Sequence, residues 1–335
     1  MARSVAIIGA GQIGYAAGYE FAFHDWDVSI CSRSKPAWQL RPGERFIEYT
    51  TGQDRAPKAD LVIDTIAFDE DDIVRYDPDA VGRLITISSA SVYCDDQGRT
   101  LDEAAVNGFP EFDAPVDEEQ STVPPGPQTY STRKVRMENR ALDLFGDRAT
   151  VIRPCAIYGP HGKHPREWWF VKRILDGRTK IPLAFAGRSQ FDTTDTQDIA
   201  KFCIEADNFA WGGVYNLASD AHESVAQIGR EIAELCEAQV ELKLFEGAPI
   251  GSVGRTPWSV PRSFRISSNK SCALENGQGD ASGFGARYGG HSLSAQIKWF
   301  RRNPPADWRA AFPQLAAYPW DLFDYAAEDR FLSSL

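Results

Sequence analysis

The chain has few of the residues that build metal centres or disulfide frameworks, and it has no long apolar run. Its 335 residues include six cysteines, five histidines and two methionines. No two cysteines form a CxxC pair, which argues against a zinc site and favours free thiols in a reducing compartment. No stretch approaches the roughly 18 apolar residues of a membrane-spanning helix. The sequence thus argues against a small disulfide-stapled fold and against a membrane protein.

Basic residues are also in deficit. Lys and Arg number 36 against 47 Asp and Glu, which gives a net charge of -11 and a pI near 5.0. Such a field repels polyanions, so we expect no nucleic acid and no membrane as partner. Hydrophobic residues make up 43% of the chain, as in ordinary globular proteins. The length suffices for about two folded units.

The amino terminus, MARSVAIIGAGQIGYAAG, has the basic start and apolar stretch of a secretory signal. It lacks a small-residue cleavage site before polar sequence. We therefore expect a cytoplasmic protein.

Short β-branched runs alternate with helical patterns through the first half of the chain. This alternation predicts an α/β fold of the Rossmann type, in which a doubly wound parallel sheet carries helices on both faces. Helices are expected at residues 12–24, 128–146, 168–175 and 225–238. The expected strands are residues 5–9, 28–32, 46–49, 61–66, 84–88, 150–153, 213–217 and 240–245.

Beyond residue 154 the pattern becomes less regular and predicts a smaller C-terminal lobe. Residues 247–290 are rich in Gly, Ser and Asn, which favours a long loop. Eight aromatic residues follow between Trp299 and Tyr325. We expect them to form an apolar cluster over the second lobe, and a lid over an active site is the alternative.

A GxGxxG motif follows the first expected strand and opens the first expected helix. Glycines in that position allow a tight turn and a close approach of the backbone to a pyrophosphate, which the free N–H groups of the helix then bind. The motif therefore predicts a dinucleotide-binding loop. Its residues are Gly9, Ala10, Gly11, Gln12, Ile13 and Gly14.

The end of the second strand indicates which dinucleotide binds. An NAD enzyme places an acidic residue there to hold the ribose 2′-hydroxyl, but this strand ends in Ser32 and Arg33. Asp27 lies before the strand and is wrongly placed for that role. Arg33 with Ser32 favours a ribose 2′-phosphate, so we expect NADP, with NAD as the second choice. A solvated surface arginine is the alternative reading of Arg33.

A Ser-Tyr-Lys set completes the pattern. Tyr130 and Lys134 are four residues apart on an expected helix, which brings the ammonium near the phenol and forms an acid–base pair. Ser89 lies at the end of the strand before it, where a parallel sheet presents groups to ligands. In this order, a glycine loop, a serine at a strand end and YxxxK predict chemistry on a carbonyl or hydroxyl group.

With these motifs the sequence resembles the short-chain dehydrogenase/reductase superfamily, in its extended branch of NAD(P)-dependent epimerases, dehydratases and reductases. The resemblance covers the chain to about residue 240. Further matches are the Asp-, Glu- and Pro-rich residues 117–127, the RPCAIYGP segment at 153–160, Asp-Ile-Ala at 198–200 and the strand at 213–217.

The resemblance assigns roles to particular residues. It implies that Tyr130 is the catalytic acid/base, that Lys134 binds the nicotinamide ribose and lowers the tyrosine pKa, and that Ser89 orients the substrate oxygen. It also implies a cofactor-binding domain of residues 1–153 and roughly 192–217, and a substrate-binding lobe of residues 154–191 and 218–335. Further cofactor contacts are expected from Ile66, Ala67, Pro154 and Ile157.

Several departures from the family pattern bear on the reaction. Ser89 is followed by Ala90 and Ser91, where the sugar-nucleotide dehydratases carry an Asp-Glu pair, which argues against dehydration. Residues 191–193 replace an Arg-Asp-Phe segment whose arginine meets the substrate diphosphate, which argues against a sugar nucleotide. Arg262, Arg265 and Lys270 fall where the family places cations for a substrate phosphate, and a solvated face is the equal alternative.

We therefore expect a cytosolic NADP(H)-dependent oxidoreductase, of the ketoreductase or alcohol dehydrogenase type, acting on a small polar carbonyl or secondary alcohol. An epimerase that retains its NAD(P) and acts on a sugar or sugar nucleotide is the first alternative. Residues 162–200 resemble an atypical subgroup with RNA-binding members, so a non-catalytic nucleotide-sensing or RNA-binding protein is the second. A monomer or a homodimer fits the sequence. We expect no metal, and His161 and His164 are interpreted as loop histidines.

Overall fold

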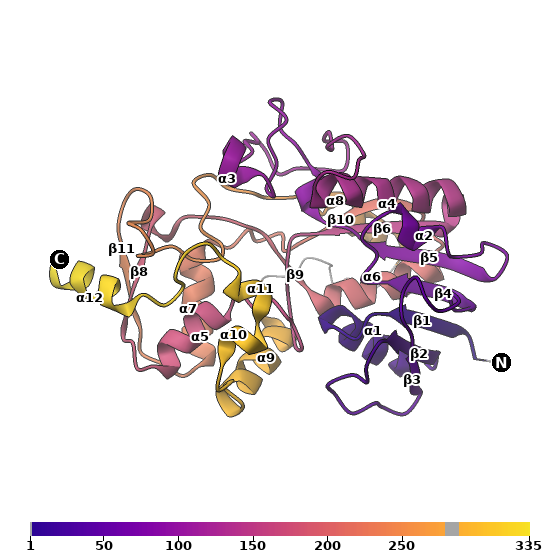
Figure 1. Ribbon diagram of the computed structural model, residues 1–335, viewed down its shortest axis with the longest axis horizontal. Helices are drawn as coiled ribbons and strands as arrows, with labels where there is room; N and C mark the ends of the chain where they lie inside the picture. Colours follow the sequence, from indigo (N-terminus) through magenta and orange to yellow (C-terminus); the bar gives the residue numbers. More distant parts are fainter. Residues whose placement is uncertain (1, 279–287) are drawn as a thin grey trace.

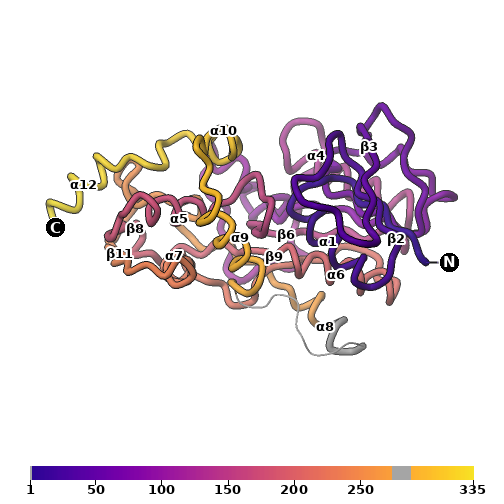
Figure 2. The backbone as a smooth tube through the Cα atoms, turned by 90° about the horizontal axis from the view of Figure 1, so that it is seen from below, coloured from indigo at the N-terminus to yellow at the C-terminus, as the bar shows by residue number. Residues whose placement is uncertain are grey.

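The computed structural model describes residues 2–278 and 288–335, which form two lobes side by side along the longest axis (Figure 1). The amino terminus lies at the outer end of the first lobe and the carboxyl terminus at the outer end of the second (Figures 1 and 2). In the described part of the chain, no helix is long and apolar enough to cross a membrane. None of the six cysteines forms a disulfide in the described structure.

The first lobe is built on a seven-stranded parallel sheet with the order β10-β6-β5-β4-β1-β2-β3. Every neighbouring pair is parallel, and the order reverses between β1 and β4, where doubly wound sheets bind ligands. This confirms the expected fold class. The strands are β1 Ser4–Ile8, β2 Asp27–Ser32, β3 Glu44–Glu48, β4 Ala59–Asp64, β5 Val81–Ile87, β6 Ala149–Pro154 and β10 Gly213–Leu217.

Helices cover both faces of this sheet (Figure 1). α1 (Gln12–Phe23) and α6 (Thr196–Asn208) pack on one face, and α2 (Glu70–Ile73) and α4 (Tyr130–Phe145) on the other. The central strands read as near-continuous apolar runs because both of their faces are buried. The crossover helix α2, between β4 and β5, has four residues.

The second lobe has its own apolar core, built around the aromatic face of α5 (Trp168–Leu175). Trp169 and Phe170 are fully buried there. Helices α7 (Val225–Leu235) and α9 (Gly290–Arg302) pack against α5, and β8 (Lys180–Leu183) pairs with β11 (Glu241–Leu244).

Residues 247–290, which are expected to form a loop, contain the helix α8 (Asn269–Gln278). This helix packs against β10. Its Ser- and Asn-rich sequence resembles a loop because these residues compete for backbone hydrogen bonds, but contact with the sheet stabilises the helix. Residues 279–287 of that segment lie outside the described residues. The remaining short elements are α3 Ala104–Asn107, β7 Ala156–Tyr158, β9 Thr193–Asp195, α10 Trp308–Ala311, α11 Pro313–Ala316 and α12 Tyr325–Ser333.

A buried ion pair holds the carboxyl-terminal helix to the second lobe. Arg173 on α5 and Glu328 on α12 are each 1% exposed. The Arg173 guanidinium bonds the Glu328 carboxylate and also donates to the backbone oxygens of Trp169 and Leu322, at 2.9 and 2.8 Å. α12 is therefore anchored through a charge that water does not reach.

Replacing Glu328 with alanine should unfold this end of the molecule more easily. The change leaves the buried Arg173 charge without its partner, which costs about 3–5 kcal/mol of the free energy of unfolding. The matched control is Asp329→Ala, because Asp329 pairs with Arg178 on the surface and is 61% exposed. Urea denaturation of both variants measures the difference, and equal stabilities would contradict the anchoring role.

Candidate functional site

The glycine loop connects β1 to α1 and is shaped by two close backbone contacts. Gly9 has a φ of +110°, and a Cβ there would overlap Thr65 and lie 2.8 Å from Ile66 Cγ2. A Cβ on Gly14 would overlap the carbonyl oxygen of Gly9. Both positions require glycine for steric reasons, as the sequence motif predicts.

The third glycine differs, because Gly11 faces open space. Nothing in the described chain lies within 4 Å of the position a Cβ would take. Gly11 is also the N-cap of α1 and has no side chain to cap the helix. The first backbone N–H groups of α1 therefore have no capping hydrogen bond. Ile13, by contrast, is buried in the core. An uncapped helix start beside open space fits the pyrophosphate of a dinucleotide.

The end of β2 presents a free cation. Arg33 is exposed, and its guanidinium makes no hydrogen bond or ion pair with any described residue. The Ser32 hydroxyl donates to the backbone oxygen of Ser34 at 2.7 Å. Asp27, at the start of the strand, pairs with Arg45 instead. No acidic side chain therefore takes the ribose-binding position at the end of this strand.

Ser89, Tyr130 and Lys134 lie together at the carboxyl edge of the sheet. Tyr130 is the first residue of α4, and the Lys134 Nζ lies 5.7 Å from the centre of its ring. The Ser89 hydroxyl accepts the Ser91 backbone N–H at 3.1 Å, and Ser89 is close enough to Tyr130 to lower its pKa. Ser89 is distant in sequence from Tyr130 and Lys134, and the fold brings the three side chains into one cluster.

Lys134 is 5% exposed and hydrogen-bonded to the sheet. Its Nζ donates to the backbone oxygens of Ala67 and Ile87, at 2.6 and 2.9 Å. Burial lowers its pKa to about 8, although the nearby carboxylates of Asp64 and Glu138 favour the charged form. An ammonium has three donors, so one remains for a ligand.

Two carboxylates that sequence reasoning missed support this cluster. Asp102 accepts the Ser131 backbone N–H at 3.0 Å and the Ser131 hydroxyl at 2.9 Å, which fixes the start of α4. Glu138 pairs with the buried Arg153 at 2.6 Å and accepts the Ser88 hydroxyl. Asp102 lies in an irregular segment, so no periodic signal marks it.

A cavity of about 620 Å³ lies between the lobes, beside Ser89 and Tyr130. Its first-lobe wall contains Gln12, Ser89 and Tyr130, and the second lobe closes the opposite side. Its size suits a small-molecule ligand. Other lining residues include Ser91, Asp102, Phe109, Pro154, Ile157, His164, Arg166, Phe191, Phe264, Tyr318 and Trp320.

The remaining expected residues have different surroundings. Ala67 is buried next to Lys134, whereas Ile66 is 51% exposed. His161 packs against the rings of Tyr15 and Trp38, and His164 lies at the cavity. The described residues contain no group of side chains that would hold a metal ion.

The aromatic tail forms the expected apolar cluster over the second lobe. Phe300, Trp308 and Phe312 are buried in the core of the second lobe. Tyr318 and Trp320 pack against that core and also line the cavity. One part of the tail is therefore core, and another part covers the cavity that contains Tyr130.

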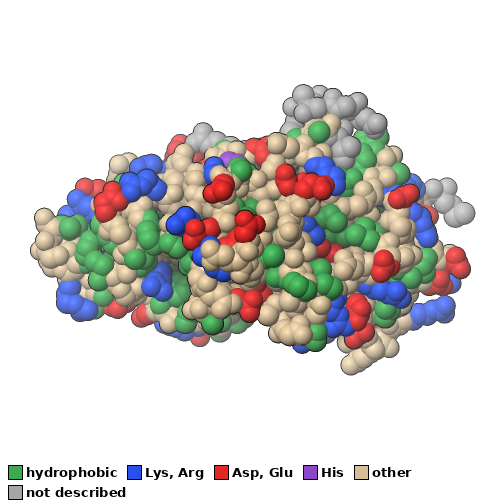
Figure 3. Space-filling model, turned by 90° about the horizontal axis from the view of Figure 1, so that it is seen from above, with side chains coloured by type: hydrophobic (Ala, Val, Ile, Leu, Met, Phe, Trp, Pro, Cys, Tyr) green, Lys and Arg blue, Asp and Glu red, His purple; other side chains and the backbone are tan. Residues whose placement is uncertain are grey.

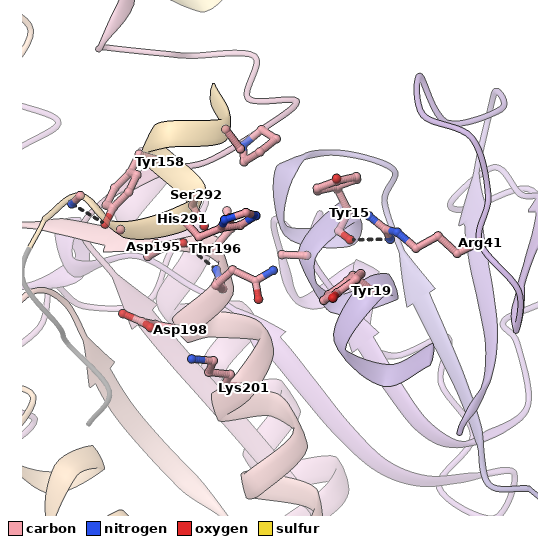
Figure 4. Close-up of a pocket in the computed structure, with 16 residues that line it drawn as sticks. Tyr15, Tyr19, Arg41, Tyr158, Asp195, Thr196, Asp198, Lys201, His291 and Ser292 are labelled. Atoms are coloured by element: carbon pink, nitrogen blue, oxygen red, sulfur yellow. Dashed lines mark hydrogen bonds between the residues drawn. The ribbon is translucent and has the colours of Figure 1, made fainter. Parts of the chain in front are cut away.

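A second cavity, of about 430 Å³, lies between α1, α6 and the start of α9 (Figure 4). Asp195 caps α6 there by accepting the Gln197 backbone N–H at 2.8 Å, and burial raises its pKa. Arg41 donates to the backbone oxygen of Tyr15 at 3.4 Å. None of the residues expected to act in catalysis lines this cavity.

Acidic and basic side chains intermix on the face of the described chain seen in Figure 3. An RNA-binding surface concentrates Lys and Arg on one face or stripe. The face in Figure 3 does not have that distribution.

No protein-family model and no curated protein matches the sequence. Among solved structures, MoeE5 in complex with UDP-glucose and NAD is 19% identical, with a TM-score of 0.63, over 90% of this chain and 100% of that one. The UDP-N-acetylglucosamine 4-epimerase from Methanobrevibacter ruminantium is 16% identical over 90% and 99%, with a TM-score of 0.63. A dTDP-glucose 4,6-dehydratase from Bacillus anthracis, in complex with NAD, is 15% identical over 94% and 100%, with a TM-score of 0.59.

This chain has the extended short-chain dehydrogenase/reductase fold. The match spans nearly the full length of the similar structures, so it includes the second lobe as well as the sheet. The resemblance seen in the sequence motifs is therefore confirmed at the level of the fold.

The glycine loop provides a test that separates folding from ligand binding. Gly14→Ala should lower the free energy of unfolding by about 1–3 kcal/mol, because the new methyl group overlaps the Gly9 carbonyl. Gly11→Ala should change it by less than about 1 kcal/mol and still weaken dinucleotide binding, because its methyl group enters the open cradle. Melting curves and calorimetric titration with NAD and NADP measure both effects. Unweakened binding by Gly11→Ala would contradict this position for the pyrophosphate.

Proposed function

We propose that the protein is a nicotinamide-dependent epimerase that oxidises and re-reduces one secondary alcohol carbon of a sugar-like substrate. The observation that carries this proposal is the cluster of Ser89, Tyr130 and Lys134 beside an uncapped glycine loop. The similar solved structures support it, since they include several 4-epimerases and complexes with NAD. In this proposal residues 1–153 and 192–217 hold the cofactor, and residues 154–191 and 218–335 bind the substrate.

Each member of the cluster has a chemical task. A bound nicotinamide dinucleotide supplies the acceptor and donor of hydride. Tyr130 takes the proton of the substrate hydroxyl and later returns it, while Ser89 donates a hydrogen bond to the same oxygen. Burial raises the pKa of Tyr130, and the hydrogen bond from Ser89 opposes that rise. The Lys134 ammonium also favours the phenolate and uses its remaining donor to hold the cofactor ribose.

The contacts between the lobes favour a retained cofactor. Gly162 of the second lobe approaches Gln12 so closely that a Cβ there would lie 2.7 Å from Gln12 Oε1. His161 packs on Tyr15 in the first turn of α1, with ring centres 4.6 Å apart. This loop covers the start of α1 next to the pyrophosphate cradle, which suits an epimerase that keeps its cofactor through the cycle.

A reductase that exchanges NADP(H) is the second candidate, and Arg33 is the observation that favours it. Its guanidinium is exposed and unpaired in the described structure at the end of β2, where a ribose 2′-phosphate would bind. In that case the cofactor leaves after each turnover, and the substrate is a small polar ketone or secondary alcohol.

Changing Arg33 to alanine tests the cofactor preference. If Arg33 binds a 2′-phosphate, the variant should lose tenfold or more in affinity for NADP, since a charge-assisted hydrogen bond contributes about 1.5–3 kcal/mol. Its affinity for NAD should stay unchanged and serves as the internal control. Calorimetric titration measures both, and an unchanged affinity for NADP would exclude this role of Arg33.

Changing Tyr130 to phenylalanine tests the mechanism. The variant keeps the ring but has no acidic proton, so turnover should fall by about 10²–10⁴-fold while cofactor still binds. Conversion of UDP-glucose or UDP-N-acetylglucosamine, followed by chromatography, measures epimerase activity, and absorbance of the reduced nicotinamide measures net reduction. If the protein is an epimerase that retains its cofactor, denaturing the wild-type protein should release about one cofactor molecule per protein chain. A Tyr130→Phe variant with wild-type turnover would refute the mechanism.

A further inference from the structure

The cavity between the lobes contains an arginine without a partner. Arg166 lines it from the second lobe, and its guanidinium makes no hydrogen bond or ion pair with any described residue. Its Nε is buried without an acceptor, and its guanidinium carbon lies 6.0 Å from the centre of the Phe191 ring. The terminal N–H groups of this guanidinium are therefore available to an anionic group of a ligand in the cavity.

The other cations considered for substrate binding are engaged elsewhere. Arg262 pairs with Glu111 at 2.9 Å, and the Lys270 Nζ donates to the Val214 backbone oxygen at 2.7 Å. Neither these two nor Arg265 lines the cavity. Among the described residues that line it, Arg166 is the only arginine or lysine.

An aromatic shelf, formed by His164, Tyr318 and Trp320, shares the cavity with Arg166. The His164 and Tyr318 ring centres are 5.5 Å apart, and those of Tyr318 and Trp320 are 4.5 Å apart. Burial and the nearby Arg166 lower the pKa of His164 to about 3, so this ring is neutral. The His164 Nε2 and the Trp320 Nε1 are buried and have no partner in the described structure. The shelf thus places three aromatic rings beside Arg166, and the Arg255 guanidinium carbon lies 5.1 Å from the centre of the Trp320 ring.

We propose that Arg166 binds an anionic group of the substrate, a carboxylate or a phosphate, and that the aromatic shelf stacks a planar ring of the same molecule. A guanidinium matches the oxygens of either anion, and aromatic faces favour flat rings. The proposal rests on the proposed function and deepens it, because the same cavity contains Tyr130. In this proposal Arg166 binds the substrate anion. The family's arginine for that role is absent, because residues 191–193 replace the segment that carries it.

The charge of the cavity also limits the substrate. Asp102 is the one carboxylate among the described lining residues, and Arg166 is the one strong cation. Asp102 accepts hydrogen bonds from Ser131 and forms no ion pair with Arg166 in the described structure. The Arg166 guanidinium can therefore pair with an anion of the ligand. One guanidinium matches one anionic group, a carboxylate or a phosphate, in a bidentate pair.

Three probes that share one ring isolate the anion. Phenyl phosphate and phenylacetate carry the two candidate anions, and benzyl alcohol carries none. Ligand-observed NMR with the full-length protein measures their affinities. At least one anionic probe should bind tenfold or more tightly than benzyl alcohol, and the tighter of the two identifies the anion. Arg166→Gln should weaken that probe by roughly ten- to a hundredfold and leave benzyl alcohol unaffected.

Two further variants control the experiment. Arg262→Gln removes a surface cation outside the cavity and should bind every probe as the wild type does. Arg166→Lys keeps the charge without the planar fork and should give an intermediate loss. Unchanged benzyl alcohol binding shows that each variant has kept its cavity. Equal binding of the anionic probes to wild type and Arg166→Gln, or no preference over benzyl alcohol, would overturn the proposal.

Probe binding requires no hydride transfer, so the two proposals fail separately. Full turnover by Tyr130→Phe would refute the proposed function whatever the probes do. Equal probe affinities for the wild type and for Arg166→Gln would refute only the proposed Arg166 subsite.

Discussion

The site depends on one buried ammonium that ties a helix to a sheet. Lys134 donates to the backbone oxygens of Ala67 and Ile87, which follow β4 and end β5. These bonds hold α4 against the carboxyl edge of the sheet at a fixed rotation. Tyr130 lies one turn earlier on the same face, which places its ring at the carboxyl edge of the sheet near Ser89. Glu138, one turn later on the same face, pairs with Arg153 of β6 and holds the helix to the sheet as well.

Burying this ammonium has an electrostatic consequence. The pKa of Lys134 is about 8 in the folded protein, against an ordinary value of 10.5, so the side chain is charged at neutral pH. Between about pH 8 and pH 10.5 the lysine therefore holds fewer protons in the folded chain than in the unfolded chain. Its contribution to the free energy of unfolding therefore grows as the pH rises from about 8 to about 10.5. The charge of the folded-state side chain is lost as the pH rises through about 8. The fold thus maintains a buried charge at a cost in stability.

Local patterns in the sequence predicted the sheet, the glycine loop and the YxxxK helix. Gly9 and Gly14 are recognisable because their steric task is set by neighbours along the chain, and Tyr130 and Lys134 because helical spacing aligns them. Arg166 was not identified, since its role depends on which cations find partners far away in sequence. α8 was missed for a related reason, because contact with β10 overrides its weak helical composition.

The central claim is that Ser89, Tyr130 and Lys134 meet a nicotinamide ring at the carboxyl edge of the sheet. A crystal structure of the protein with NAD tests it most directly. The account predicts the pyrophosphate at the backbone N–H groups after Gly11, the ribose at Lys134 and the nicotinamide beside Tyr130. A dinucleotide bound elsewhere, or a Tyr130 hydroxyl directed away from the ring, would contradict it.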